Sequence, residues 1–340
     1  MRKFLNYPEN FVDEALEGIV LAHSDKVGLL EKDPRVLVRT DGKSSQKKVG
    51  IVTGGGFGHL PVFLGYVGYG LADSCAVGNV FSSPGSSQIL HGIEAADRGK
   101  GVLQLLGCYQ GDKMNFKMAG RMAEAEGIPC KAVIVSDDIA SASIEQRESR
   151  RGIAGIMFVY KVAGACAETG ADLQEVARVA QKAADAVRSF GVSLSSCCIP
   201  AVGHPGFEIA EGEMEIGMGI HGEPGLEKSS LRTADETAEI LMTKLLEDQS
   251  CPPGSEIALL VNGLGATPLE ELYILYRQVN KICRDKEIKI YHSYIGEYAT
   301  SLEMAGASFS VMKLDDELKK YLKAPCDSPF FLQNQLDSLC

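Results

Sequence analysis

The sequence predicts an α/β protein in which a mostly parallel sheet flanked by helices is followed by a second, smaller α+β domain. Short apolar runs alternate with longer amphipathic segments in the first half of the chain, a pattern typical of parallel sheets covered by helices. The 340 residues, 45% of them hydrophobic, are enough for two cores. Beyond about residue 190 the strand-like segments follow one another more closely. We therefore expect one domain over residues 1–190 and another over residues 191–340.

Composition and charge exclude several classes of protein. A net charge of -11 argues against direct nucleic-acid binding, because a phosphate-binding surface needs clustered Lys and Arg. No apolar run is long enough to cross a membrane, and the first residues lack a signal core. The ten cysteines form no CxxC pair and none stands at metal-ligand spacing from a histidine. We expect a cytoplasmic protein with buried reduced thiols, no metal and no membrane contact.

The expected elements follow from the apolar periodicity and from the Gly and Pro residues that interrupt it. Met114, Met118 and Met122 recur at helical spacing, and we expect them to pack in the core. Helices are expected at residues 8–24, 61–69, 87–96, from 112 onward, 153–189, 231–247 and 269–283, and strands at 36–39, 49–52, 76–81, 101–106, 131–136, 193–200, 213–220, 256–261 and 288–294.

A glycine-rich bend at residues 53–61 connects the strand at 49–52 to His59. Glycines allow positive φ and a close approach of the backbone to a compact group, and Pro61 restricts the chain after the histidine. The bend lacks the Lys-Ser/Thr of a phosphate-binding loop and the spacing of a dinucleotide fingerprint. It is therefore either a small-molecule loop of another kind or a tight turn around a packed histidine.

Acidic residues follow two later strands. Asp112 comes just after the strand at 101–106, at the sheet edge where open α/β sheets bind ligands, although a lone Asp is also a common helix cap. Asp137 and Asp138 repeat the pattern and either bind a cation or cap a helix.

His221 stands at the end of the expected strand 213–220, where Gly217 and Gly219 strip one strand face of side chains. A bare strand face costs stability, so we expect a ligand or another backbone to lie against it. A neutral imidazole can attack a carbonyl carbon or accept a hydroxyl proton, and a carboxylate can accept the proton of an alcohol during phosphorylation. No nucleotide loop is evident, so a phosphoryl donor would have to come from another chain.

Five segments carry a family resemblance: residues 54–61, 111–116, 151–155, 219–225 and 300–306. Together they resemble the substrate-binding subunit of dihydroxyacetone kinase, in matching order over essentially the whole chain. The resemblance implies a two-domain fold, a homodimer, and a short ketose bound to a histidine as a covalent hemiaminal. By this resemblance His221 forms the adduct, His59 hydrogen-bonds the substrate and Asp112 is the general base. The implied substrate-binding positions are Gly55, Gly56, Phe57, Gly58, Phe81, Ser83 and Gly107.

The resemblance also implies that this chain binds no cofactor itself. A nucleotide-binding partner subunit would carry the donor, either ATP directly or tightly held ADP that a phosphotransferase-system protein recharges, together with Mg²⁺. A reversible carbon–nitrogen bond would select ketones and aldehydes over polyols, and would orient the terminal hydroxyl toward the donor.

The chain departs from the family pattern in two loops. Phe57 and Leu60 stand where the family has serine and glutamate, Gly107-Cys108 replaces lysine-asparagine, and Gln110 replaces threonine. Three hypotheses follow: a kinase subunit, with Gly107 leaving room for a longer substrate; a non-catalytic ketose sensor that acts as a transcriptional coactivator; and a small-molecule binding protein without a kinase partner. The presence of Asp112 favours the first, and the altered loops favour the others.

Overall fold

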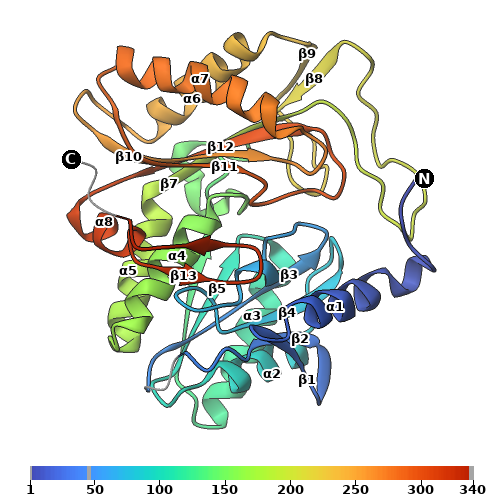
Figure 1. The fold of residues 1–340 in the computed structure, drawn as a ribbon, viewed down its shortest axis with the longest axis vertical. Helices are drawn as coiled ribbons and strands as arrows, with labels where there is room; N and C mark the ends of the chain where they lie inside the picture. The colour runs from blue at the N-terminus through green and yellow to red at the C-terminus, as the bar shows by residue number, and fades with distance from the viewer. Residues whose placement is uncertain (1, 44–46, 337–340) are drawn as a thin grey trace.

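The computed structural model describes residues 2–43 and 47–336, and these residues build two six-stranded sheets (Figure 1). The first sheet has the order β1-β2-β4-β3-β5-β6, and its core strands β3, β4, β5 and β6 run parallel. β1 and β2 are added antiparallel at one edge. The strands are β1 (Val27–Leu30), β2 (Asp33–Arg39), β3 (Gly50–Phe57), β4 (Ser74–Val80), β5 (Val102–Gly107) and β6 (Cys130–Val135).

Helices cover both faces of the first sheet, which explains why β3 and β5 are buried along their whole length. α2 and α3 pack on one face and share a core with β3 and β5. α4 and α5 lie against the other face. The helices of this half are η1 (Pro8–Asn10), α1 (Phe11–Ala22), η2 (Leu64–Tyr66), α2 (Ser86–Ala96), α3 (Gln110–Ala125), η3 (Ile144–Ser149), α4 (Ile156–Glu168) and α5 (Leu173–Ala186).

The second sheet has the order β11-β10-β12-β7-β8-β9 and is antiparallel except for the β10–β11 pair. α6 and α7 cover its outer face (Figure 1). Its elements are β7 (Val187–Ser193), β8 (Glu213–Ile216), β9 (Glu227–Ser230), α6 (Ala234–Asp248), β10 (Glu256–Gly263), α7 (Leu269–Asp285), β11 (Lys289–Gly296) and β12 (Gly306–Lys313), followed by α8 (Asp316–Leu322), β13 (Cys326–Asp327) and β14 (Leu332–Gln333).

The predicted fold class is confirmed: a largely parallel sheet flanked by helices precedes a smaller α+β unit. Residue 190 lies inside β7, the first strand of the second sheet. One core cluster contains α4 and α5 and continues to Leu260 and Met312 of the second sheet. The division into residues 1–190 and 191–340 therefore stays a prediction, since the two sheets share this core.

Several predicted elements are wrong in extent. Residues 61–69 hold only the short η2 instead of an α-helix, because the backbone N–H groups of Gly68 and Tyr69 donate to the carbonyl oxygens of Ala72 and Asp327 rather than to a preceding helical turn. Residues 153–189 form two helices and the start of β7. The strand expected at 193–200 lies earlier, at 187–193. β8 ends at Ile216, because Gly217 takes a φ of +83° and turns the chain.

The three methionines of α3 are not in the core. Met114, Met118 and Met122 are 63%, 52% and 38% exposed, while Phe116 and Ala119 of the same helix are buried. The i, i+4 spacing did place the methionines on one helix face, but that face is the outer one.

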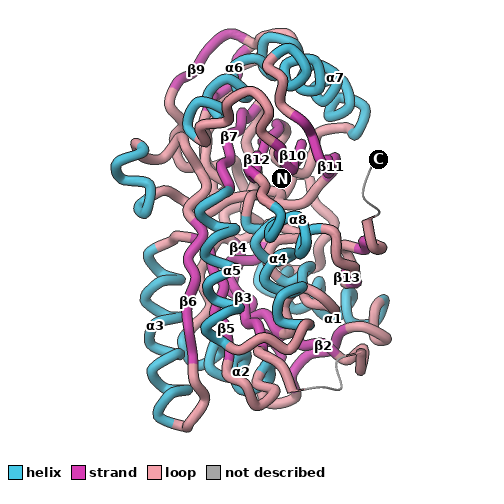
Figure 2. Tube along the Cα trace, turned by 90° about the vertical axis from the view of Figure 1, so that its left-hand side faces the viewer, coloured by secondary structure: helices cyan, strands magenta, loops and turns pink. Residues whose placement is uncertain are grey.

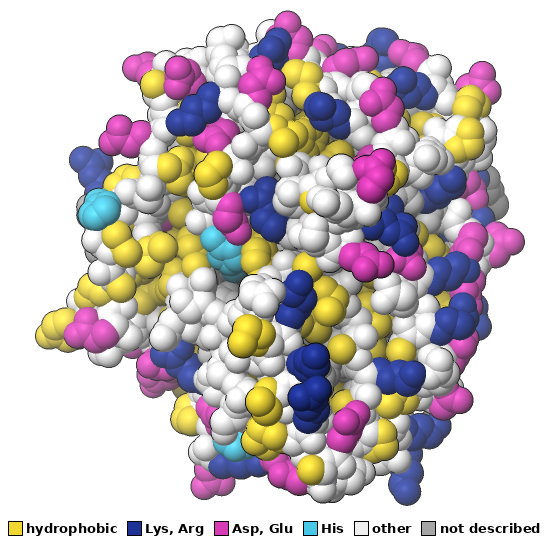
Figure 3. All heavy atoms as spheres, turned by 180° about the vertical axis from the view of Figure 1, so that it is seen from behind, with side chains coloured by type: hydrophobic (Ala, Val, Ile, Leu, Met, Phe, Trp, Pro, Cys, Tyr) yellow, Lys and Arg dark blue, Asp and Glu magenta, His cyan; other side chains and the backbone are white. Residues whose placement is uncertain are grey.

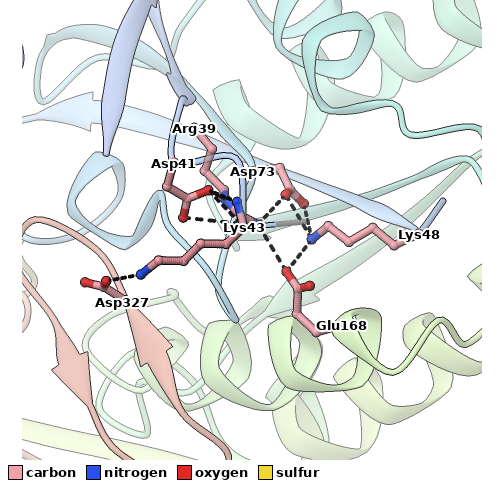
Figure 4. A network of polar contacts seen from close by, with 7 residues as sticks. All are labelled: Arg39, Asp41, Lys43, Lys48, Asp73, Glu168 and Asp327. Carbon is pink, nitrogen blue, oxygen red and sulfur yellow. Dashed lines mark hydrogen bonds and ion pairs between the residues drawn. The ribbon is translucent and has the colours of Figure 1, made fainter. Parts of the chain in front are cut away.

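A buried ion network holds the first sheet to α4, and the more exposed ion pair between Lys43 and Asp327 lies beside it (Figure 4). Arg39 lies 3.0 Å from Asp73, and Lys48 lies 2.9 Å from both Asp73 and Glu168. All four side chains are at most 14% exposed. Removing one member of such a network leaves a buried charge unpaired, which is strongly destabilising.

Among the described residues no helix is long and apolar enough to cross a membrane. The nine cysteines in the described part of the chain are free thiols, and most of them are buried.

Candidate functional site

Side chains and backbone of the protein fill the space beside the glycines of β3. A Cβ on Gly55 would lie 2.0 Å from the Phe63 ring, and one on Gly56 would lie 2.6 Å from the Ser82 nitrogen. Gly58 has a φ of +106°, which turns the chain into the loop that carries His59. The glycines therefore accommodate neighbouring parts of the protein rather than a ligand. This close packing holds the loop that carries His59.

His59 is fully buried, and its Nδ1 lies 2.8 Å from the carbonyl oxygen of Thr300. A carbonyl oxygen can only accept, so Nδ1 carries the proton and Nε2 keeps a lone pair. Nε2 is buried and has no partner. Burial, followed by the nearby charge of His221, lowers the pKa of His59 to about 3. His59 is therefore a neutral hydrogen-bond acceptor, held in place by the Thr300 carbonyl.

His221 lies in the turn after β8, and its ring centroid is 4.8 Å from that of His59 at an interplanar angle of 77°. Its Nδ1 lies 3.0 Å from Oε1 of Glu223, and its backbone N–H donates to Oε2 of Glu223 at 3.0 Å. The side chain is 22% exposed. Nδ1 is thus occupied, and Nε2 is the nitrogen free to react.

The bare strand face expected beside His221 does not exist as such, because β8 ends before Gly217. A Cβ on Gly217 would lie 2.7 Å from Cβ of Ala140. One on Gly219 would lie 2.1 Å from Oε2 of Glu223 and 2.5 Å from Nη1 of Arg151. Gly217 thus makes room for apolar side chains of the protein, and Gly219 makes room for the charged ends of Glu223 and Arg151.

Asp112 lies in the first turn of α3 and is 4% exposed. It is not the helix cap, a position held by Tyr109, and its Oδ1 has no partner. Burial raises the pKa of Asp112 to about 6, against the opposing effects of a Ser83 hydrogen bond and the charge of His221. Such a carboxyl can exchange a proton near neutral pH.

Aromatic rings enclose the two imidazoles. Phe81 stacks on His59 with ring centroids 4.8 Å apart, and its ring lies 5.3 Å from that of His221. The Tyr109 ring lies 4.7 Å from that of His221. Figure 3 shows a histidine side chain in a surface hollow, bordered by hydrophobic and charged side chains.

Three buried polar atoms without a partner belong to residues of this cluster: Nε2 of His59, the hydroxyl of Tyr109 and Oδ1 of Asp112. Within the described part of the chain only one further side-chain atom of this kind was found, on Gln249. Buried polar groups are nearly always hydrogen-bonded. Their concentration around His221 therefore indicates a site for a small polar ligand.

The other predicted substrate-binding positions do not all lie at the site. Phe81 and Ser83 contact the cluster. Gly107 is the buried last residue of β5, and a Cβ there would make ordinary contacts with the Tyr109 ring at 3.5 Å and with the Gly152 carbonyl oxygen at 3.6 Å. Phe57 instead packs edge-on against Phe11, with ring centroids 5.9 Å apart. Gly55, Gly56 and Gly58 shape the loop, as described above.

The Asp137–Asp138 pair does not form a cation site. Asp137 accepts the backbone N–H groups of Ile153 and Gly155, each at 2.8 Å, and Asp138 binds Nε of Arg151 at 2.7 Å. Both carboxylates are satisfied by the protein. No group of three or more His, Cys, Asp or Glu that could hold a metal was found in the described ranges.

Two residues of the site were not singled out from the sequence. Glu223 stands two residues after His221, inside the segment 219–225 that carries the family resemblance, but nothing in the spacing shows that its carboxylate returns to Nδ1. Tyr109 stands two residues after the end of β5. Open α/β sheets bind their ligands at the carboxyl ends of strands, so this position could have identified it.

The fold and this site define a Dak1-domain protein: the model of the Dak1 domain matches residues 17–330, and the chain belongs to this family. The chain is 44% identical to the dihydroxyacetone-binding subunit DhaK of a PTS-dependent dihydroxyacetone kinase 2 from Listeria innocua, over 97% of this chain and 99% of that protein. The predicted family resemblance is thereby confirmed.

Two solved structures superpose closely. The dihydroxyacetone kinase of C. freundii matches with a TM-score of 0.89 and 30% identity, over 100% of this chain and 62% of that chain. A dihydroxyacetone kinase operon co-activator, Dha-DhaQ, matches with a TM-score of 0.88 and 30% identity, over 94% of this chain and 98% of that chain.

Proposed function

We propose that this chain is the substrate-binding subunit of a dihydroxyacetone-type kinase and holds a short ketose as a covalent hemiaminal on His221. One observation carries the proposal: Nε2 of His221 is free, and the unpartnered atoms of His59, Tyr109 and Asp112 belong to the residues around it. A ketose with two hydroxyl groups and one carbonyl supplies the groups that such a set of atoms can bind. The name of the Listeria innocua relative supports the same substrate class.

His221, His59 and Asp112 have different roles in this proposal because they differ in protonation. Nε2 of His221 attacks the carbonyl carbon, and Nε2 of His59 accepts a hydrogen bond from a ketose hydroxyl. Asp112, whose pKa burial raises to about 6, accepts the proton of the terminal hydroxyl as that oxygen is phosphorylated. The donor, ATP or ADP with Mg²⁺, belongs in this proposal to a nucleotide-binding partner subunit in the cytoplasm, and this chain is inactive without that subunit.

A second candidate is a ketose sensor that acts as a transcriptional coactivator. It is favoured by the close superposition of the co-activator Dha-DhaQ. Both candidates require the adduct on His221, but only the kinase subunit requires the carboxylate of Asp112 as a base.

The test separates the two candidates. Reconstituted with a donor subunit and its phosphoryl source, the wild type phosphorylates dihydroxyacetone, whereas Asp112→Asn keeps the adduct but turns over at least ~10³-fold more slowly. Unchanged turnover in Asp112→Asn would remove that residue from the role of base. A stable adduct with no turnover in the wild type would favour the sensor.

The outer face of α3 and the edge of β6 fit a homodimer. Met114, Met118, Met122 and Ile134 are exposed there, and β6 is the edge strand of its sheet, between α3 and α5 (Figure 2). A cavity of about 380 Å³ lies along this edge. Exposed apolar faces beside an open strand edge favour pairing with a second copy. Sedimentation should show a dimer that Met118→Glu converts to a monomer; a wild-type monomer at micromolar concentration would contradict this.

A further inference from the structure

The carboxylate of Glu223 determines which nitrogen of His221 carries the proton. Oε2 accepts the backbone N–H of His221 at 3.0 Å, and Oε1 lies 3.0 Å from Nδ1. A backbone N–H can only donate, and both oxygens of a carboxylate can only accept. In the neutral ring Nδ1 must therefore carry the proton, which leaves the lone pair on Nε2.

A chain of charged groups holds this carboxylate in place. Nη1 of Arg151 lies 3.9 Å from Oε2 of Glu223, its Nη2 donates to the Gly217 carbonyl at 3.1 Å, and its Nε binds Asp138 at 2.7 Å. Asp138 is 1% exposed. Any Cβ at position 219 would collide with both the carboxylate and the guanidinium. Asp138 and the Gly217 carbonyl thus hold the guanidinium beside Glu223, and glycine at position 219 leaves the space that the two side chains occupy.

The charges keep Glu223 ionised. Burial acts to raise the pKa of Glu223, but the hydrogen bond to His221 and the charges of His221 and Arg151 outweigh it and lower the pKa to about 2. An anion therefore faces the Nδ1 side of His221 throughout the neutral range.

We propose that Glu223 is a positioning residue, held by Arg151 and Asp138, which fixes the Nδ1–H tautomer of His221 and balances the charge of the ketose adduct. The inference rests on the proposed function, because it explains how the free nitrogen becomes a nucleophile.

Covalent capture joins Nε2 of His221 to the carbonyl carbon of the ketose. The Nε2 lone pair of His221 forms the new C–N bond, and the π pair of the carbonyl moves onto its oxygen, which takes one proton from solvent. The ring retains its Nδ1 proton and becomes an imidazolium cation. The carboxylate of Glu223, 3.0 Å from Nδ1, lies against this cation, so the adduct forms as an ion pair.

Glu223→Gln breaks this arrangement in a defined way. A glutamine has only one acceptor oxygen, and the backbone N–H of His221 claims it. The amide NH₂ then faces Nδ1, which must become the acceptor, so the proton moves to Nε2 and the nucleophile is lost. Glu223→Asp keeps two acceptor oxygens and the negative charge.

The experiment measures the tautomer without ligand and the adduct with ligand. Long-range ¹H–¹⁵N spectra of ¹⁵N-histidine protein should show His221 protonated at Nδ1 in the wild type and in Glu223→Asp, and at Nε2 in Glu223→Gln. With ¹³C-dihydroxyacetone, adduct formation should be about 100-fold weaker in Glu223→Gln and largely restored in Glu223→Asp. The matched control is Glu215→Gln, which alters a buried carboxylate on the same segment that binds the Gly225 N–H at 2.7 Å; it should leave the tautomer and the adduct unchanged.

The outcomes separate this inference from the proposed function. A wild-type tautomer in Glu223→Gln, or an adduct of wild-type strength, overturns the role of Glu223. A wild type that shows the Nδ1–H tautomer but forms no adduct with dihydroxyacetone or erythrulose refutes the proposed function instead, while the tautomer assignment holds.

Discussion

His59 and His221 are neighbours with opposite surroundings. His59 follows a strand of the first sheet and is fully buried, with its Nδ1 held by a backbone carbonyl. His221 follows a strand of the second sheet and is 22% exposed, with its Nδ1 held by the carboxylate of Glu223. Nδ1 therefore has a hydrogen-bond partner in both rings, and Nε2 is the nitrogen that each ring leaves available to a ligand.

The difference between the two Nδ1 partners assigns different chemistry to the same residue type. A carbonyl fixes the tautomer but brings no charge, and burial lowers the pKa of His59 to about 3, so its ring stays neutral. A carboxylate fixes the tautomer and also stabilises a positive ring. His59 is thus suited to accept a hydrogen bond, and His221 is suited to form a bond that leaves its ring cationic.

The largest expected effect on stability is at His59. Replacement by alanine should lower the free energy of unfolding by about 3 kcal/mol, because it opens a buried cavity and leaves the Thr300 carbonyl unpaired. His221→Ala, at a partly exposed turn, should cost less than about 1 kcal/mol. Urea unfolding of both variants measures the two losses. Equal losses would mean that the two histidines do not differ as described.

Asp112→Asn should stabilise the protein at high pH. The folded pKa of about 6 lies above the ordinary value of 3.8, so the stability that the protonated carboxyl contributes is fully present below about pH 4 and is lost as the pH rises through 6. At pH 8 the variant should gain roughly 2–3 kcal/mol over the wild type, and this gain should vanish near pH 4. Denaturant titrations at several pH values test this.

The control for that titration is Asp316→Asn, since the Asp316 side chain is fully exposed. It should show no comparable pH dependence. A flat difference between Asp112→Asn and the wild type from pH 4 to pH 8 would show that Asp112 is solvated rather than buried at the site.

The smallest effect is expected at Gly107, in contrast to Gly219. A Cβ at Gly107 would make an ordinary contact with the Tyr109 ring at 3.5 Å, so Gly107→Ala should change stability by less than about 1 kcal/mol and adduct formation by less than about threefold. Gly219→Ala, which forces Glu223 and Arg151 apart, should weaken the adduct about as much as Glu223→Gln does. Titration with ¹³C-dihydroxyacetone compares them.

The sequence predicted the parts of this site that depend on local pattern. His59, Asp112 and His221 each follow a strand-like run, and the ends of strands are readable from glycine and apolar periodicity. The fold class follows from the same pattern, and the resemblance named the three residues together.

The rest depends on tertiary partners that no local pattern encodes. The spacing of Met118 and its neighbours shows a helix face but not which way that face points. The glycine at 219 indicates a missing side chain, yet only the fold shows that Arg151 and Glu223 fill the space. The bond from Glu223 back to Nδ1 of His221 depends on a turn whose geometry is set by Gly217 and Gly222, both at positive φ.

The central claim is that His221 binds a ketose covalently, and native intact-protein mass spectrometry with dihydroxyacetone tests it most directly. The wild type should gain the mass of one ketose per chain, His59→Ala should gain it only at higher ketose concentration, and His221→Ala should gain none. An adduct that persists in His221→Ala, or a wild type that never gains this mass, would contradict the account.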